Sequence, residues 1–112
     1  MSISTHVLDM ARGKPAAGVS VTLALRGSGG TWKELSRGVT DDAGRHHAHA
    51  SGGGAEPGVY RLIFDVGAYH ETQRMEGFFP EVAVEFIIRE PGQQFHVPLL
   101  LSPFGYSTYR GT

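Results

Sequence analysis

The pattern that most restricts this chain is the alternation of apolar and polar residues in short runs, broken repeatedly by glycine and proline. In residues 59–66 every second position is apolar, and residues 19–26 and 82–88 repeat the pattern. A period of two is typical of a β-strand with one buried face. The 16 glycines and 6 prolines keep these runs short and separate them by turns. The sequence therefore predicts an all-β sandwich or barrel.

We expect eight strands and one helix. Residues 68–76 lie between two glycines and contain good helix formers without proline, which predicts a short helix. Residues 51–58 are expected to form a loop within one domain that covers residues 1–112. A helix after the fifth strand suggests a sandwich of two four-stranded sheets. The predicted strands cover residues 4–10, 19–26, 31–39, 45–50, 59–66, 82–88, 95–101 and 104–110.

Composition excludes several classes of protein. The net charge is −1 with the basic residues dispersed, which argues against a nucleic-acid partner. The chain has no cysteine, so disulfide and thiolate chemistry are excluded. No apolar run approaches the roughly 20 residues of a membrane span. The first residues lack the pattern of a signal peptide, so we expect a cytoplasmic protein, with a removed leader as the open alternative.

The last two predicted strands, residues 95–101 and 104–110, are apolar and nearly uncharged. An exposed sheet edge of this kind invites uncontrolled pairing, so we expect it to pair with another copy of the chain. Pro98 fits such a strand only at an edge or a bulge.

Three polar residues on strand-like segments, His6, Arg45 and His96, are candidates for a catalytic site. A histidine near its ordinary pKa can take a proton from water, and a second can share that proton. Arginine can stabilise the negative charge that develops on a carbonyl oxygen. With the Thr112 hydroxyl and carboxylate nearby, the set predicts a metal-free hydrolytic site for a small, planar, polar substrate. Taken alone, a histidine on a strand is more often a hydrogen-bonded or solvent-facing residue without a catalytic role.

The competing site is a metal site at His46, His47 and His49, since imidazoles two residues apart share one face of a strand. No carboxylate or cysteine close in sequence completes the ligand set, so a solvated polar strand is the favoured interpretation. His70, on the predicted helix, is expected at the surface. The glycine-rich loops lack the lysine and serine of a phosphate-binding loop.

Three segments carry a family resemblance: STHVLDMARGKPAAGVSVTL near the start, the DDAGR turn, and FHVPLLLSPFGYSTYRGT at the end. Together they span nearly the whole chain and resemble the 5-hydroxyisourate hydrolases of the transthyretin-related family. The resemblance implies a transthyretin-like sandwich and a homotetramer, a dimer of dimers, with active sites in the channel between dimers. It also implies hydrolysis of 5-hydroxyisourate to 2-oxo-4-hydroxy-4-carboxy-5-ureidoimidazoline, without a cofactor or metal.

Matched to the family motifs, His6 and His96 are implied to position and deprotonate water, and Arg45 to hold a substrate oxygen. Tyr109 is implied to contact substrate, with Arg110, Gly111 and Thr112 completing the terminal motif. Two positions depart from the family pattern: Thr112 replaces the usual serine, and the turn before Arg45 is one residue longer than the tight Asp-Gly-Arg form. A threonine keeps the hydroxyl and adds a methyl group.

The main rival to the enzyme is a carrier that binds a small aromatic ligand in the same channel. Burying His6, Arg45 and His96 around an apolar ligand would cost several kcal/mol, on the order expected for unpaired polar groups. The sequence therefore favours the enzyme over the carrier.

Overall fold

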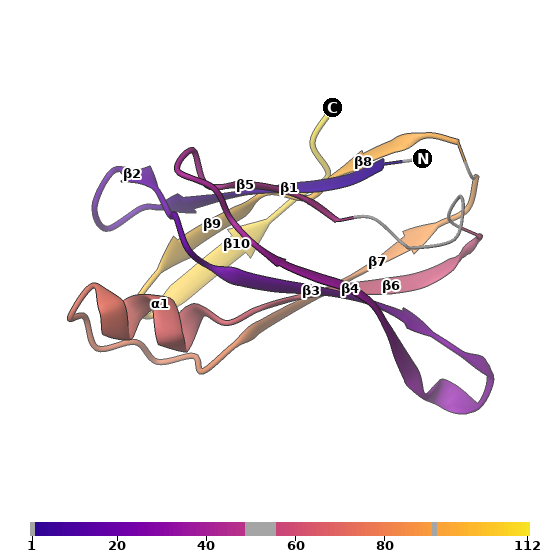
Figure 1. Ribbon diagram of the computed structural model, residues 1–112, viewed down its shortest axis with the longest axis horizontal. Helices are drawn as coiled ribbons and strands as arrows, with labels where there is room; N and C mark the ends of the chain where they lie inside the picture. The colour runs from indigo at the N-terminus through magenta and orange to yellow at the C-terminus, as the bar shows by residue number, and fades with distance from the viewer. Residues whose placement is uncertain (1, 49–55, 91) are drawn as a thin grey trace.

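The computed structural model describes residues 2–48, 56–90 and 92–112, which form two sheets packed face to face (Figure 1). One sheet contains four antiparallel strands in the order β4 (Trp32–Val39), β3 (Ser20–Arg26), β6 (Gly58–Phe64) and β7 (Val82–Ile88). The short 3₁₀ helix η1 (Ser28–Gly30) joins β3 to β4. Buried side chains alternate along most of β3, β6 and β7, as the pattern predicted: Val21, Leu23, Tyr60, Leu62, Phe64, Val82 and Val84.

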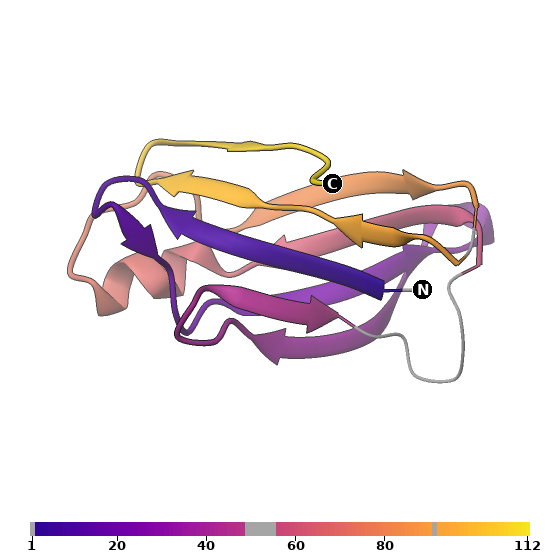
Figure 2. The same ribbon diagram turned by 90° about the horizontal axis from the view of Figure 1, so that it is seen from above.

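The second sheet is built around β1 (Ser2–Asp9), which contacts strands from three distant parts of the chain. β2 (Lys14–Pro15) and β5 (Arg45–Ala48) pair with it in antiparallel fashion, whereas β8 (Gln94–His96) and β9 (Leu99–Ser102) pair in parallel. β10 (Gly105–Thr108) pairs with β9 and forms an outer edge (Figure 2). The predicted all-β sandwich is confirmed.

The strand count differs from the prediction, because this sheet has six strands rather than four. The predicted strand over residues 95–101 is interrupted at Pro98, which has no N–H to donate to a ladder. Its two halves, β8 and β9, pair with successive parts of β1. The remaining addition is β2, two residues inside a predicted turn. Of the predicted strand over residues 45–50, the last two positions lie outside the described residues, as do residues 51–55 of the predicted loop.

The helix exists, but its predicted bounds were wrong: α1 is Val66–Thr72 rather than residues 68–76. Asp65 caps it, accepting a hydrogen bond from the Ala68 N–H at 3.2 Å. Val66, predicted as the end of a strand, is therefore its first residue. Gly67 is the second residue of the helix, and a glycine fits there because an added Cβ would approach the Pro80 carbonyl oxygen to 2.8 Å.

The prediction that His70 lies at the surface was wrong. His70 is only 3 % exposed, because the short helix packs both Tyr69 and His70 against its neighbours. A Cβ at residue 77 would come within 2.7 Å of the Nδ1 of His70, so the glycine there accommodates the ring. Within the described part of the chain, that nitrogen has no hydrogen-bond partner.

The Asp9 carboxylate anchors this end of the sandwich. It is 2 % exposed, accepts a hydrogen bond from the Tyr69 hydroxyl at 2.7 Å, and accepts another from the Arg12 N–H at 3.0 Å. Burial, reinforced by the carboxylate, raises the pKa of Tyr69, so the phenol keeps its proton and donates it. β1 is thereby tied to α1.

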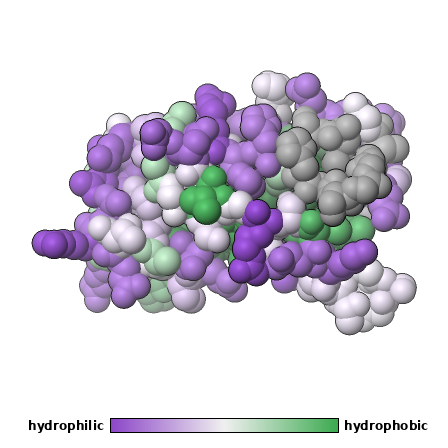
Figure 3. All heavy atoms as spheres, in the orientation of Figure 1, coloured by the Kyte–Doolittle hydropathy of each residue, from purple (hydrophilic) through white to green (hydrophobic). Residues whose placement is uncertain are grey.

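One face of the molecule is mostly hydrophilic, with hydrophobic residues visible only in small patches (Figure 3). The main cluster of apolar side chains is buried between the sheets. Within residues 2–48, 56–90 and 92–112, no helix has the length and apolar character that a membrane span requires.

Candidate functional site

Strand pairing brings the three candidate residues together from opposite ends of the sequence. His6 on β1 lies opposite Arg45 on β5. Two residues earlier on β1, Ser4 lies opposite His96 on β8. Residues two apart on a strand share a face, so the side chains of His6, Arg45 and His96 belong to one face of the sheet. The predicted constellation is therefore assembled within one chain.

The turn before Arg45 is held by the Asp41 carboxylate, which accepts hydrogen bonds at 2.9 Å from the N–H groups of both Ala43 and Arg45. The Arg45 N–H is the main cause, ahead of Ala43, that lowers the pKa of Asp41, while burial opposes the shift. Gly44 has φ 77° and packs against the Val7 carbonyl, so only glycine fits. The longer turn thus forms a defined start to β5.

The His6 ring is fixed by the same turn. Its Nε2 lies 2.8 Å from the carbonyl oxygen of Ala43. A carbonyl only accepts hydrogen bonds, so Nε2 carries the hydrogen and Nδ1 is the nitrogen with a lone pair in the neutral ring. The turn that positions Arg45 therefore also selects the tautomer of His6.

The His96 ring is held from two sides. Its Nδ1 lies 2.9 Å from the hydroxyl oxygen of Ser4. On the other side, a Cβ at Gly111 would come within 2.6 Å of the His96 Cδ2, and the Gly111 N–H donates to the His96 carbonyl at 2.7 Å. Burial, followed by the positive charge of Arg45, lowers the pKa of His96. The ring is therefore neutral at neutral pH and able to accept a proton.

Of these residues, Arg45, His96, Ser4 and Gly111 line an open cavity of about 500 Å³ whose lining side chains are mostly polar. It is formed by the face of β1, β5 and β8 together with the C-terminal segment, which ends close to β8 (Figure 1). The size suits a small molecule. Its lining residues are Ser4, Arg45, Gln94, His96, Arg110, Gly111 and Thr112. We refer to it as the polar groove.

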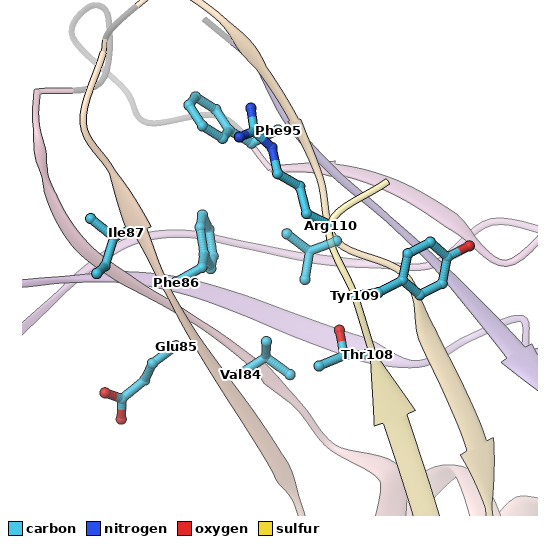
Figure 4. Close-up of a pocket in the computed structure, with 9 residues that line it drawn as sticks. Val84, Glu85, Phe86, Ile87, Phe95, Thr108, Tyr109 and Arg110 are labelled. Carbon is cyan, nitrogen blue, oxygen red and sulfur yellow. The ribbon is translucent and has the colours of Figure 1, made fainter. Parts of the chain in front are cut away.

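Two predicted site residues, Tyr109 and His6, do not line the polar groove, and Tyr109 is the one that borders a different cavity. It is 59 % exposed and borders a second cavity of about 230 Å³, between β7 and the C-terminal segment. This apolar groove is shown in Figure 4, where Tyr109 points away from Val84 and Phe86. Arg110 borders both cavities, and its guanidinium lies 5.1 Å from the centre of the Phe95 ring. His6 does not line the polar groove directly, but adjoins it through Arg45.

The rival metal site gains no further ligands. Within the described residues, no group of three or more His, Asp or Glu side chains could hold a metal ion. His46 points away from His47, with its ring packed against Gly38 on β4. His49 lies outside the described residues.

Sequence reasoning did not select Ser4 and Gln94 as lining residues. The available signal for Ser4 was its position two residues before His6, hence on the same strand face. What could not be read from one sequence was the parallel pairing that sets Ser4 beside His96.

Among known proteins, the chain is similar in sequence to several named 5-hydroxyisourate hydrolase. The chain is 48 % identical to a 5-hydroxyisourate hydrolase of Salmonella typhimurium, over 98 % of this chain and 80 % of that protein. It is 42 % identical to the 5-hydroxyisourate hydrolase of Mus musculus, over 98 % and 94 % respectively.

Solved structures of a 5-hydroxyisourate hydrolase and of a transthyretin have a similar fold. The 5-hydroxyisourate hydrolase of Klebsiella pneumoniae superposes with a TM-score of 0.85 at 37 % identity, covering all of both chains. Sea bream transthyretin in complex with thyroxine gives a TM-score of 0.91 at 32 % identity, covering 98 % of this chain and 94 % of the other. The family model described as HIUase/Transthyretin family matches residues 3–111. The chain therefore belongs to the HIUase/Transthyretin family.

Proposed function

We propose that this protein, acting as one hydrolase domain, hydrolyses 5-hydroxyisourate to 2-oxo-4-hydroxy-4-carboxy-5-ureidoimidazoline in urate catabolism. The observation that carries the proposal is the polar groove, in which a neutral histidine, His96, lies beside the permanent positive charge of Arg45. The relatives named 5-hydroxyisourate hydrolase, at 42–48 % identity over nearly the whole chain, support the same substrate.

In the proposed reaction, water adds to a ring carbonyl carbon of the substrate while a histidine takes one of its protons. The C–O bond forms, the ring C–N bond breaks, and the departing nitrogen takes up a proton from the protonated histidine. Arg45 stabilises the oxyanion formed on the way. His6 and His96 share the work of positioning the water and taking its proton. Thr112, Arg110 and Gly111 contribute to substrate binding, and no metal is required.

Assembly belongs to the proposal. The family resemblance implies a dimer of dimers, with the grooves at the interface between dimers. The openness of the polar groove to solvent and the exposed aromatic residues near the C-terminal edge, Phe104, Tyr106 and Tyr109, support a site completed by other copies of the chain. Tyr109, which lies outside the polar groove of its own chain, would contact substrate only in such an assembly.

The decay of 5-hydroxyisourate in the ultraviolet, with substrate generated in place from urate and urate oxidase, tests the activity. We expect decay faster than the spontaneous rate, and a loss of about 100-fold or more in kcat/KM for Arg45→Ala. The activity is expected to survive a chelator. Decay no faster than the spontaneous rate, with folded protein present, would overturn the proposal.

Dilution tests the assembly. If the active sites need more than one chain, specific activity is expected to fall as the protein dissociates, in step with the sedimentation coefficient. Full specific activity in a demonstrated monomer would contradict the proposed assembly and leave the reaction untouched.

The second candidate function is that of a carrier. It is favoured by the apolar groove, together with the similarity of the chain to a transthyretin in complex with thyroxine. It predicts binding of an aromatic ligand without turnover. Isothermal titration with such a ligand, set beside the decay assay, separates the two candidates.

A further inference from the structure

Ser4 is a polar residue of the groove to which nothing above assigns a function. It lies on β1, opposite His96 on the parallel strand β8. Its backbone carbonyl accepts a hydrogen bond from the Val97 N–H at 2.9 Å. This bond holds the backbone of β1 at Ser4 against the residue that follows His96. Its hydroxyl oxygen lies 2.9 Å from the Nδ1 of His96.

The contact leaves the two nitrogens of His96 in different situations. Nδ1 has the Ser4 hydroxyl, whereas no described residue forms a hydrogen bond with Nε2. The ring cannot tilt away from Ser4 freely, because the Cα of Gly111 lies against its Cδ2 edge. The nitrogen that each proton occupies is set by the hydrogen bond that the other nitrogen makes.

A serine hydroxyl can donate to Nδ1 or accept from it. Only the second arrangement places a lone pair on Nε2, and it persists after Nε2 has taken a proton, because Nδ1–H still donates to Ser4. A hydroxyl that donated to Nδ1 would instead put hydrogen on Nε2, and that nitrogen could not act as a base. A Ser4 hydroxyl that accepts from Nδ1–H is thus compatible with both the neutral and the protonated form of His96.

We propose that Ser4 is a positioning residue: its hydroxyl accepts from Nδ1–H of His96, so that Nε2 of His96 is the nitrogen that takes the proton from water. This inference rests on the proposed hydrolase function and adds to it a choice between the two histidines. His6 is less suited to that role in this arrangement, because its Nε2 hydrogen is directed to the carbonyl of Ala43.

The test compares Ser4→Ala with Ser4→Thr, which keeps the hydroxyl and suits a strand. Ser28→Ala, in the exposed loop between β3 and β4, is the matched serine control. We expect Ser4→Ala to lower kcat by about 5- to 10-fold, the size of one net hydrogen bond, with KM little changed. Ser4→Thr should recover most of the rate, and Ser28→Ala should match the parent protein.

The pH profile gives a readout that a loss of folding would not produce. Removing the acceptor disfavours the charged ring, so the acid limb of kcat/KM is expected to move to lower pH in Ser4→Ala. The titratable and charged groups around this ring are His6 on β1, Arg45 and His47 on β5, and Arg110 of the C-terminal segment, and all of them remain in the variant. The shift is therefore assigned to the lost hydroxyl.

Nitrogen NMR of the His96 ring decides the question without activity. We expect Nδ1–H as the dominant neutral tautomer in the parent protein and in Ser4→Thr, and a mixture of tautomers in Ser4→Ala. The same tautomer in all three proteins, or hydrogen on Nε2 in the parent, would overturn the inference. An inactive parent protein with the expected spectra would overturn the hydrolase proposal while leaving the contact between Ser4 and His96 established.

Discussion

On β1, His6 and Asp9 are only three positions apart but lie in opposite surroundings, His6 toward the groove end of the sandwich and Asp9 at its helix end. His6 is half-buried on the outer face beside Arg45, at the rim of an open groove. Asp9 is buried on the inner face, and each of its carboxylate oxygens has a hydrogen-bond donor. The Asp9 carboxylate therefore has its hydrogen-bond donors within the protein, whereas the polar side chains of the groove line an open cavity. The arrangement around Asp9 stabilises the fold, and we propose that the arrangement around Arg45 and His96 binds and hydrolyses the substrate.

A large effect confined to the groove end is expected from Gly111→Ala. The added methyl would lie 2.6 Å from the Cδ2 of His96, so the ring must move. Because small misplacements of a catalytic group are costly, we expect kcat/KM to fall by about 10- to 100-fold with little change in melting temperature. Gly105→Ala is the control, since nothing lies within 4 Å of its added Cβ. Equal activity of the two variants would contradict the tight packing at His96.

Tyr69→Phe probes the other end. It leaves a buried Asp9 oxygen without its donor, which costs about 1–3 kcal/mol. Differential scanning calorimetry should show a clear fall in melting temperature, with kcat/KM unchanged while the protein is folded. Tyr60→Phe is a milder control, because it frees only the carbonyl of the exposed Glu56, which water can reach. A larger loss of stability in Tyr60→Phe would show that the Asp9 contact has been overvalued.

The smallest expected effect is on the pH dependence of stability. The pKa of His96 is lower in the folded protein than in the unfolded chain, so the unfolded chain binds the proton more readily. The folded state is therefore unaffected by His96 above about pH 6.5 and loses stability as pH falls toward the folded pKa. In urea titrations at pH 8 and pH 5, His96→Gln should lose less stability between the two than the parent protein. A steeper loss of stability in the variant would mean that His96 stabilises the folded protein at low pH, which contradicts this prediction.

Local alternation was sufficient to predict the strands whose two faces differ most. β3, β6 and β7 bury alternate side chains along most of their length, and their predicted ranges agree with the structure within two residues at either end. The helix was less predictable, because its start depends on the Asp65 cap and on the close approach of Gly67 to Pro80, a contact across 13 positions. His70 was misplaced for a related reason, since a seven-residue helix lying on the sandwich buries more than one stripe of side chains.

For the site, motif matching identified Arg45, His96 and the terminal residues, and pairing in the structure brings them to one groove. Ser4 was not predicted, because its contact with His96 arises from a parallel pairing between residues 92 positions apart. Tyr109 was predicted to contact substrate and borders the neighbouring apolar groove. A single sequence carries no signal for which chain of an assembly a residue serves.

The most direct test of the contrast between the two ends is to measure kcat/KM for 5-hydroxyisourate and the melting temperature of His96→Ala and Tyr69→Phe side by side. We expect His96→Ala to lose about 100-fold or more in kcat/KM at a nearly unchanged melting temperature, and Tyr69→Phe to lose stability with activity retained. If both variants instead lost activity only in proportion to their loss of folded protein, the groove would not be a catalytic site.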